Sequence, residues 1–250
     1  MRAPLAVPFP PLEPPPARVE FPSPRDLGDE DVAAVGADFS PSTLLLAYRS
    51  GIFPWPNGRL VGWFSPDPRA IFPLEQAHFS RSLVRTLRRR VLGRRPFVVT
   101  VDAAFQEVMR LSAETRPEGT WITPPLFRGY VKLHELGWAH SVEVWLEGGE
   151  SRELVGGIYG LSIGGLFAGE SMFHLCTDAS KVAFAHLVAR LTAAGAELFD
   201  VQVPNEHLTS LGCVSIRRDA YLDRLANALD KPSCDWGALA DVDPWRASGA

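Results

Sequence analysis

The sequence predicts an α+β protein with a mostly antiparallel sheet. Two observations predict this class. Some segments place apolar residues at helical spacing, i, i+3, i+4 and i+7, whereas others are strand-length apolar runs bounded by glycine or charge. Three strand-like segments also follow one another without a helix between them. That order is typical of α+β proteins rather than of folds that alternate strand and helix.

The expected elements have ordinary lengths and recognisable ends. Ser40 followed by Pro41 indicates a helix start, with the serine as N-cap and the proline in the first turn, and Gly51 indicates the end of that helix. We expect helices at residues 41–49, 79–90, 103–114, 124–136 and 179–194, and strands at 97–101, 140–146, 154–161, 166–173 and 198–203. This order of elements resembles the acetyltransferase-like fold of the GNAT superfamily.

Composition divides the chain into four expected parts. Seven of the first 16 residues are proline, which predicts a polyproline-type or disordered arm. Pro66 and Pro68 make a later junction rigid and non-helical, so we place a domain boundary there. The parts are a Pro-rich arm at 1–24, a small N-terminal domain at 25–68, a larger GNAT-like domain at 69–231 and an irregular tail at 232–250.

Overall composition excludes several classes of protein. The chain has 250 residues, of which 46% are hydrophobic, and a formal net charge of −4, which is enough for one large domain or two small ones. We find neither an apolar run long enough to span a membrane nor a signal-peptide pattern. Cys176, Cys213 and Cys234 fit neither a disulfide framework nor a zinc site, so we expect a reduced, cytoplasmic setting and no metal.

A run of arginines contrasts with the acidic net charge. Seven arginines and no acidic residue lie between Arg81 and Arg95. Four of them recur at i, i+4, i+7 and i+8, which places them on one helix face: Arg81, Arg85, Arg88 and Arg89. A solvated face is one interpretation. A phosphate partner is favoured, because no glutamate four residues away neutralises the stripe.

One acidic residue interrupts an apolar strand. Alternation along residues 166–173 places Glu170 on the same face as Leu166, Ala168 and Met172. A carboxylate is costly to bury there unless a partner compensates it. Either Glu170 has an internal partner or an exposed edge position, or it is a specificity carboxylate that receives the cation of a ligand.

A second strand carries two polar residues opposite an apolar face. In residues 198–203, Phe199, Val201 and Val203 share one face, whereas Asp200 and Gln202 lie on the other. One interpretation is a half-solvated edge strand. The alternative is a site in which Asp200, hydrogen-bonded to Gln202, accepts a proton from an amine or holds that amine in place.

Two further features are open to two interpretations each. Gly156 and Gly157 lie inside a strand, where a bulge or the close approach of a ligand would explain them. Trp55 and Trp121 lie in turns rich in proline or threonine. Each is therefore as easily a ligand platform as a core residue.

Eight spaced blocks, taken in order, resemble the leucyl/phenylalanyl-tRNA–protein transferase family. The resemblance covers residues 21–225. The longest blocks read LLLAYRSGIFPW from Leu44, WFSPDPRA from Trp63, AHSVEVW from Ala139 and LVGGIYG from Leu154. Shorter ones read GTWIT from Gly119, LHELG from Leu133, GESMF from Gly169 and DVQ from Asp200. So many blocks in the right order are highly specific.

The resemblance implies an activity and a pair of substrates. It implies a small N-terminal domain followed by a GNAT-like catalytic domain. The expected enzyme moves leucine, phenylalanine or methionine from charged tRNA to proteins that begin with arginine or lysine. The product is marked for N-degron degradation. The ester is already activated before it reaches this enzyme, so we expect no cofactor.

The resemblance also assigns expected roles to individual residues. Asp200 and Gln202 match the pair that handles the acceptor's α-amino proton, and Glu170 matches the contact for its basic side chain. The positions that match the aminoacyl pocket are Trp55, Trp121, Ile158, Phe167, Leu187 and Leu191. Three of them are apolar replacements, since the family carries methionine at the position of Ile158 and phenylalanine at those of Leu187 and Leu191. The arginine stripe matches a region of tRNA contact.

Two rival functions remain at this stage. An acyl-CoA N-acyltransferase needs a glycine-rich loop that opens a helix and binds pyrophosphate. Residues 90–93 begin like that loop, but Pro96 follows two more arginines and no helix can open there. An RNA-binding module without catalysis would explain the arginine stripe. It would not explain Glu170, Asp200 and Gln202.

Overall fold

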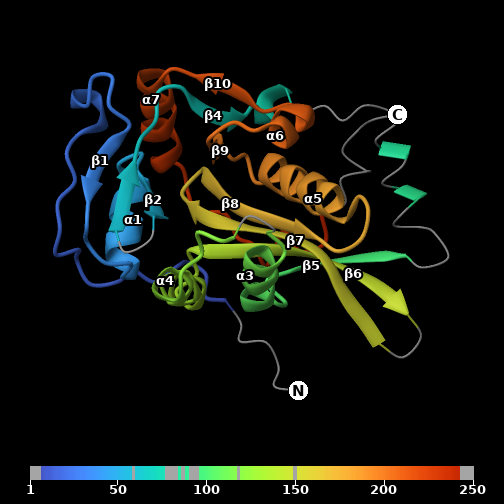
Figure 1. The fold of residues 1–250 in the computed structure, drawn as a ribbon. Helices are drawn as coiled ribbons and strands as arrows, with labels where there is room; N and C mark the ends of the chain where they lie inside the picture. The colour runs from blue at the N-terminus through green and yellow to red at the C-terminus, as the bar shows by residue number, and fades with distance from the viewer. Residues whose placement is uncertain are drawn as a thin grey trace.

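The computed structural model describes residues 7–57, 60–76, 84–85, 88–89, 96–116, 119–148 and 151–242. It confirms an α+β protein with mostly antiparallel sheets and a small N-terminal part (Figure 1). The large sheet has seven strands in the order β10-β4-β9-β8-β7-β6-β5. In that order they are Val214–Ile216, Arg69–Phe72, Leu198–Gln202, Leu166–His174, Ser151–Ile163, Ala139–Gly148 and Phe97–Val101. The GNAT-like detail stays a prediction.

One pair of strands in the large sheet is parallel. β8 and β9 pair in parallel, and all other neighbours pair antiparallel. The helix α5, Ala179–Ala193, connects them. Their pairing covers only three residues of each strand and ends at Ala168 and Asp200. The backbone ladder between β8 and β9 therefore ends before Glu170 and Gln202.

Helices cover both faces of the large sheet and create a core on each side. α3, Phe105–Glu114, and α4, Pro124–Glu135, pack on one face, and α5 packs on the other (Figure 1). A Cβ added to Gly156 would lie 2.6 Å from the Cβ of Ala179, and one added to Gly157 would lie 3.0 Å from Val108. The glycine pair therefore admits α5 and α3 close to the sheet. Of the two interpretations, a bulge fits, because the register between β6 and β7 shifts beside Gly156, and the close approach comes from helices rather than a ligand.

The small N-terminal sheet contains a strand where we expected a turn. Its order is β1-β3-β2, formed by Val32–Val35, Leu60–Phe64 and Phe53–Asn57. We expected a turn at residues 52–58 because of its prolines. Proline is tolerated in β2 because β2 is an edge strand, where a missing N–H breaks no ladder.

The expected helix at 41–49 is confirmed as α1, Pro41–Arg49. The hydroxyl of Ser40 accepts a hydrogen bond from the N–H of Thr43, as expected of an N-cap. The expected strand at 97–101 is also confirmed with the same limits, and the other expected strands and helices in the described residues differ by a few positions. Of the expected helix at 79–90, only Val84, Arg85, Arg88 and Arg89 lie among the described residues, and all four are helical.

The described part of the Pro-rich arm packs against the rest of the chain. The N–H of Leu12 donates to the carbonyl of Leu136, and the indole of Trp138 donates to the carbonyl of Leu12, both at 2.8 Å. Glu13 forms an ion pair with Arg49. Residues 1–6 lie outside the description. The segment from Leu12 is thus held in place by both backbone and side-chain bonds.

Several elements were not expected from the sequence. They are η1 at Pro24–Asp26, η2 at Leu74–Gln76, α6 at Glu206–Leu211 and α7 at Arg218–Leu229, together with β1 to β4 and β10. α7 lies beside the N-terminal segment (Figure 1), where Arg218 donates to the carbonyls of Pro24, Gly28 and Glu30. In the part of the chain that the structure covers, no helix is both long and apolar enough to cross a membrane.

Candidate active site

A cavity of about 590 Å³ opens where the N-terminal sheet meets the large sheet. Its apolar lining is Phe53, Pro54, Trp55, Trp121, Ile158, Met172, Phe173, Phe184, Phe199, Val201, Val203, Pro204 and Leu208. Its other lining residues are Thr115, Arg116, Gly169, Glu170, Ser171, His174, Gln202, Asn205 and His207. A largely apolar cavity with a few convergent polar groups is typical of a small-ligand site. The segments of β8 and β9 beyond their short pairing both contribute to it.

Two tryptophans from distant parts of the chain stack at this cavity. The ring centroids of Trp55 and Trp121 lie 6.2 Å apart, with 27° between the ring planes. Trp55 lies on β2, and Trp121 precedes α4. Trp55 is 43% exposed, which is unusual for so large a side chain without a partner to cover it. Of the two open interpretations, the position of this pair favours a ligand platform.

The other residues expected in the aminoacyl pocket divide into two groups. Ile158 lines the cavity, as expected. Phe167, Leu187 and Leu191 are not among the lining residues; they lie in the core between α5 and the sheet. Phe184 and Phe199 lie in the same core and reach the cavity. Two residues of the apolar wall of the cavity, Phe184 and Phe199, thus share a core with the three predicted residues that do not line it.

Glu170 lies in a β-bulge. Gly160 of β7 faces Gly169 of β8, and the next residue, Tyr159, faces Ser171, so Glu170 is the extra residue in β8. A bulge redirects side chains, and it separates Glu170 and Ala168 from Met172, which packs toward the opposite core. The expected alternation therefore holds up to Glu170 and fails at Met172.

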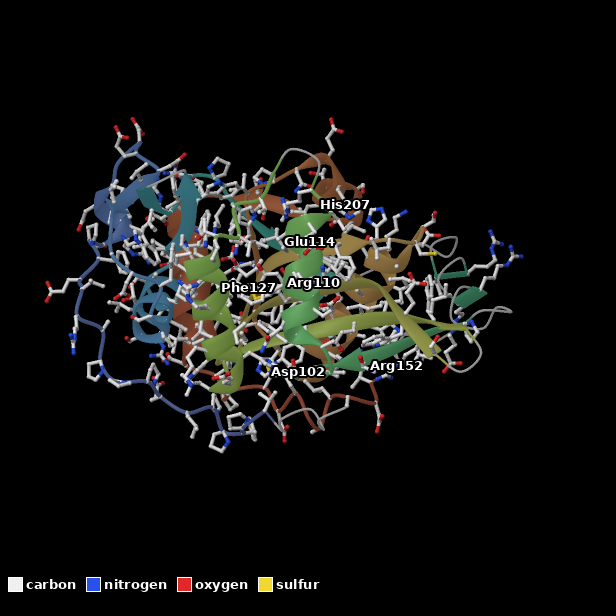
Figure 2. The ribbon with its side chains drawn as sticks, turned by 60° about the horizontal axis from the view of Figure 1, so that its bottom comes forward. Asp102, Arg110, Glu114, Phe127, Arg152 and His207 are labelled. Carbon is white, nitrogen blue, oxygen red and sulfur yellow. The ribbon has the colours of Figure 1, made fainter. Side chains whose placement is uncertain are left out.

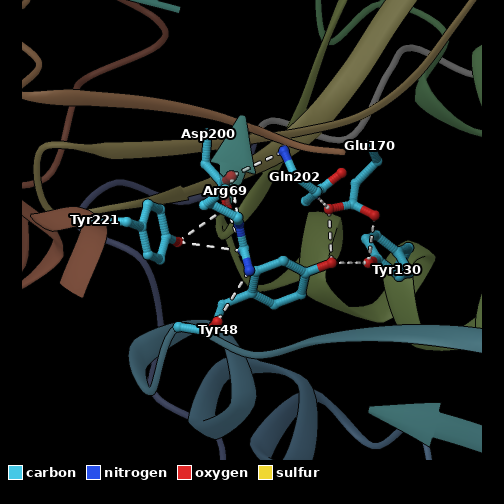
Figure 3. A network of polar contacts seen from close by, with 8 residues as sticks. Tyr48, Arg69, Tyr130, Glu170, Asp200, Gln202 and Tyr221 are labelled. Atoms are coloured by element: carbon cyan, nitrogen blue, oxygen red, sulfur yellow. Dashed lines mark hydrogen bonds and ion pairs between the residues drawn. The ribbon is translucent and has the colours of Figure 1, made fainter. Parts of the chain in front are cut away.

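Three neutral donors surround the Glu170 carboxylate. Oε1 accepts hydrogen bonds from Tyr48 at 2.6 Å and from the Gln202 amide at 2.9 Å, and Oε2 accepts one from Tyr130 at 2.8 Å (Figure 3). The two tyrosine hydroxyls are themselves 2.5 Å apart. Loss of solvation raises the pKa of the Glu170 carboxyl to about 7, although the hydrogen bonds from the tyrosines oppose the shift. In the described residues this carboxylate has hydroxyl and amide partners rather than a cation.

Asp200 is fully buried and paired with an arginine. Nε and Nη2 of Arg69 donate to its two carboxylate oxygens at 2.9 and 2.7 Å, and the hydroxyl of Tyr221 donates to Oδ2 at 2.9 Å (Figure 3). Arg69 also lies over the rings of Phe53 and Tyr221, 4.7 and 4.4 Å from their centroids. A two-pronged pair of this kind is strong and directional. Asp200, held in this pair, is not among the residues that line the cavity.

Gln202 joins the two carboxylates. Its backbone N–H donates to Oδ1 of Asp200 at 2.9 Å, and its side-chain amide donates to Glu170. Its φ angle of 61° lies in the left-handed region, which costs about 1–2 kcal/mol for a residue with a side chain. The backbone bond to Asp200 helps to hold this conformation. β9 is an internal strand, so the expectation of a half-solvated edge is wrong.

Sequence analysis missed four residues of this network: Tyr48, Arg69, Tyr130 and Tyr221. Glu170 and Asp200 gave the signal, because a carboxylate in an apolar strand requires a partner. Tyr48 and Tyr130 are the partners of Glu170, and Arg69 and Tyr221 are those of Asp200. Arg69 lies 131 positions from Asp200 along the chain. No local pattern connects the two residues.

The predicted tRNA-binding arginines are only partly described. Arg85, Arg88 and Arg89 are helical and exposed. Arg81 lies outside the described residues. Their role in tRNA contact stays a prediction. Over the described ranges, no group of three or more His, Cys, Asp or Glu side chains is arranged to hold a metal ion.

Comparison with known protein families matches most of the chain. Residues 71–226 match the family model described as leucyl/phenylalanyl-tRNA protein transferase. Residues 37–67 match the model for the N-terminal domain of the same family. The second match covers α1, β2 and β3, so it includes Tyr48 and Trp55. The first covers Glu170, Asp200 and Gln202.

Similar proteins from several bacteria carry the same family name. The leucyl/phenylalanyl-tRNA–protein transferase of Stutzerimonas stutzeri is 49% identical over 209 residues, which cover 82% of this chain and 88% of that protein. The proteins of that name from an Anaeromyxobacter species and from Idiomarina loihiensis are 48% and 44% identical, and cover 87% and 89% of this chain and 91% and 94% of their own lengths. On these matches, the chain belongs to the leucyl/phenylalanyl-tRNA–protein transferase family of aminoacyltransferases.

Proposed function

We propose that this chain moves leucine, phenylalanine or methionine from charged tRNA to the α-amino group of proteins that begin with arginine or lysine. The transfer would take place in the cytoplasm and mark those proteins for N-degron degradation. The observation that carries the proposal is the joining, in one cavity, of an apolar wall, the Trp55–Trp121 pair and a carboxylate, Glu170. Family membership supports the aminoacyl-tRNA as donor.

The reaction needs positioning more than proton removal. The acceptor nitrogen attacks the ester carbonyl, a C–N bond forms, the bond to the ribose oxygen breaks, and the proton lost by the amine ends on that oxygen. An α-amino group has a pKa of about 7.7–8.0, so roughly a tenth is already the free base near pH 7. Correct alignment of the two reactants can contribute roughly 7–11 kcal/mol at best.

In this proposal Asp200 acts through Gln202. Both oxygens of Asp200 are occupied by Arg69 and Tyr221, and its side chain is 0% exposed. Gln202 lines the cavity and is fixed at its backbone by Asp200. We therefore assign the direct contact with the acceptor amine to the carbonyl oxygen of the Gln202 side chain, and a positioning role to Asp200.

Glu170 receives the basic side chain of the acceptor in the same scheme. A carboxylate offers about four lone-pair positions, and three are occupied by Tyr48, Tyr130 and Gln202. The position that remains, on Oε2, suits an ammonium or one arm of a guanidinium. A bound cation would favour the ionised carboxylate and lower its pKa from the value of about 7 in the free protein.

The apolar wall receives the aminoacyl side chain. Trp55, Trp121 and Ile158 remain our candidates for this pocket, and Phe184 and Phe199 join them because they line the cavity. Phe167, Leu187 and Leu191 would act indirectly, by packing behind that wall. Arg81, Arg85, Arg88 and Arg89 remain the candidates for contact with the body of the tRNA.

A transfer assay with two peptides tests the proposal. Purified protein is mixed with radiolabelled leucyl-tRNA and a peptide that starts with arginine or with aspartate, and label in the peptide is counted. We expect label on the arginine peptide only. Label mainly on the aspartate peptide would remove the role of Glu170. No label on either peptide, with turnover of acetyl-CoA instead, would replace the proposed function by an acyl-CoA acyltransferase.

A further inference from the structure

The mouth of the cavity carries one permanently charged cation among its described lining residues. The exposed lining residues, which form the mouth, are Trp55, Thr115, Arg116, His174, Val203, Pro204, Asn205 and His207. Arg116 follows the C-terminal end of α3, two residues beyond Glu114. Figure 2 shows Glu114 near one end of α3, with His207 beyond that end. Arg116 and His207 thus come to one opening from different elements.

Arg116 hydrogen-bonds to neutral oxygens. Its Nε donates to the backbone carbonyl of Ser112 at 3.3 Å, and its Nη2 donates to the hydroxyl of Ser171 at 2.8 Å. Ser171 is part of the cavity lining, so the guanidinium is held against the site. Within the described ranges no carboxylate forms an ion pair with it, so among those residues its positive charge at the mouth has no neutralising partner.

Arg110, six residues earlier on α3, shows the contrast. It forms ion pairs with Glu107 and Glu114 on the same helix and does not line the cavity. Figure 2 shows Arg110 and Glu114 on α3. The charge of Arg110 is therefore neutralised within α3. Arg110 is a surface arginine paired with carboxylates of its own helix, whereas Arg116 lies beyond the end of α3 and bonds to neutral oxygens. The pair offers a matched comparison of the same side chain in two settings.

None of the other described residues at the mouth has an acidic side chain. Burial, and then the nearby Lys181 and His174, lower the pKa of the His207 imidazole. His207 is therefore a neutral hydrogen-bonding group at pH 7. Lys181 lies 3.3 Å from Asp178, which offsets its charge. An anion that enters the mouth would thus meet the charge of Arg116 and the neutral imidazole of His207.

The proposed donor substrate brings such an anion to the mouth. The ester lies on the ribose of the terminal nucleotide, and the 5′ carbon of the same ribose carries a phosphate. When the ester carbonyl lies at Gln202, one sugar separates it from this phosphate, and Arg116, bonded to Ser171 next to Glu170, lines the same cavity. A guanidinium binds phosphate oxygens well because its N–H groups form a planar fork.

We propose that Arg116 binds the 5′ phosphate of the terminal nucleotide of the aminoacyl-tRNA and so sets the depth at which the ester enters the cavity. This inference rests on the proposed function. It assigns the backbone contact nearest the reacting atoms to a residue outside the arginine stripe. Contacts of this kind position a nucleic acid without reading its sequence.

Two small donors that differ only in one phosphate test the inference. They are the phenylalanyl esters of adenosine and of adenosine 5′-monophosphate, each with an arginine-starting peptide as acceptor. For the wild type we expect the phosphate to raise kcat/KM about tenfold, the usual scale of a charge-assisted hydrogen bond. In Arg116→Met this gain is lost, so the ratio of kcat/KM between the two esters falls to about one.

Control variants and the adenosine ester distinguish phosphate binding by Arg116 from a general effect on folding or activity. Arg110→Met should keep the full gain, and Arg116→Lys should keep part of it, because lysine retains the charge but not the fork. Activity with the adenosine ester shows that each variant is folded. An unchanged gain in Arg116→Met, or an equal loss with both esters, would overturn the inference. Failure of the wild type to transfer from full-length leucyl-tRNA would instead overturn the proposed function.

Discussion

Asp200 illustrates how a buried charge limits its own chemistry. The Arg69 fork and the Tyr221 hydroxyl occupy its oxygens from one side, and the Gln202 backbone occupies Oδ1 from the other. Removing one partner of such a pair leaves an uncompensated charge in the core, which typically costs about 3–5 kcal/mol. An arrangement this complete favours fixed geometry over proton exchange with a substrate.

Asp200→Asn tests the positioning role. We expect kcat to fall about 10²-fold or more, because the asparagine amide cannot accept from Nη2 of Arg69 and the resulting shift displaces Gln202. The acidic limb of the kcat–pH profile should remain, since it belongs to the acceptor's α-amino group. Tyr221→Phe, which removes the hydroxyl but leaves both arms of Arg69 on Asp200, serves as a milder control. An acidic limb that vanishes in Asp200→Asn would make Asp200 the proton acceptor after all.

Glu170 should make stability depend on pH. Its folded pKa of about 7 lies above the unfolded value of 4.5, so between these values the folded state binds more protons. The contribution of Glu170 to the free energy of unfolding is therefore fully present below about pH 4.5 and is lost as the pH rises through 7.

Glu170→Gln should remove that dependence. Relative to the wild type, the variant should gain about 1–3 kcal/mol between pH 4.5 and pH 7.5, measured by urea unfolding. Glu143, whose pKa burial also raises to about 7, is present in both proteins, so its contribution cancels. A stability difference that does not change with pH would show that Glu170 ionises normally in the folded protein.

At the scale of elements, capping and stop residues predicted the helix whose ends they determine. The Ser40–Pro41 start and the Gly51 stop predicted α1 with its observed limits. The strand β2 could not be predicted, because its prolines are acceptable only at an edge, and edge positions follow from sheet order. α7 had a detectable signal, since Tyr221, Leu222, Leu225 and Ala228 recur at helical spacing and are buried.

The same distinction applies to the site. Glu170, Asp200 and Gln202 were predicted because a polar residue in an apolar strand is conspicuous. Arg69 was not, because its partner depends on β4 pairing with β9. The bulge at Glu170 was also unpredictable, since register is a property of two strands. Sequence therefore located the polar residues of the site but not the residues that hold them.

The close contact between β7 and α5 gives a prediction at this scale. Gly156→Ala would place a Cβ 2.6 Å from the Cβ and 2.9 Å from the backbone carbon of Ala179, so α5 must move. We expect a loss of about 1–3 kcal/mol in unfolding free energy, the usual cost of overpacking a core. The double variant Gly156→Ala/Ala179→Gly should lose less than the sum of the two single changes. Strict additivity would show that the two residues do not interact.

At the scale of the whole molecule, the site depends on segments far apart in the sequence. β2 of the small sheet supplies Trp55, the segment before α4 supplies Trp121, and the large sheet supplies Glu170 and Gln202. The small sheet and the large sheet must therefore be held together for the cavity to exist. α1 contributes to this, because Tyr48 on α1 bonds to both Tyr130 on α4 and Glu170 on β8.

The Pro-rich arm should affect stability rather than catalysis. Removal of residues 1–16 deletes the Leu12 bonds to Leu136 and Trp138 and the Glu13–Arg49 ion pair, all outside the cavity. We expect Tm to fall by about 2–8 °C, as for a loss of about 1–2 kcal/mol in a chain of this size. Transfer from leucyl-tRNA should keep its kcat within about twofold. An unchanged Tm would mean that the arm contributes nothing to the folded state.

The Arg69–Asp200–Tyr221 cluster also constrains how this sequence can vary. Each member is buried, and each has the other two as partners, although they come from β4, β9 and α7. A change at Arg69 or at Asp200 alone leaves the other charge buried without its partner, and Tyr221 bonds to both. A combinatorial library that randomises one codon at a time should return almost only the parental residue. A library that randomises all three codons together should yield folded solutions, among them clusters without any charge.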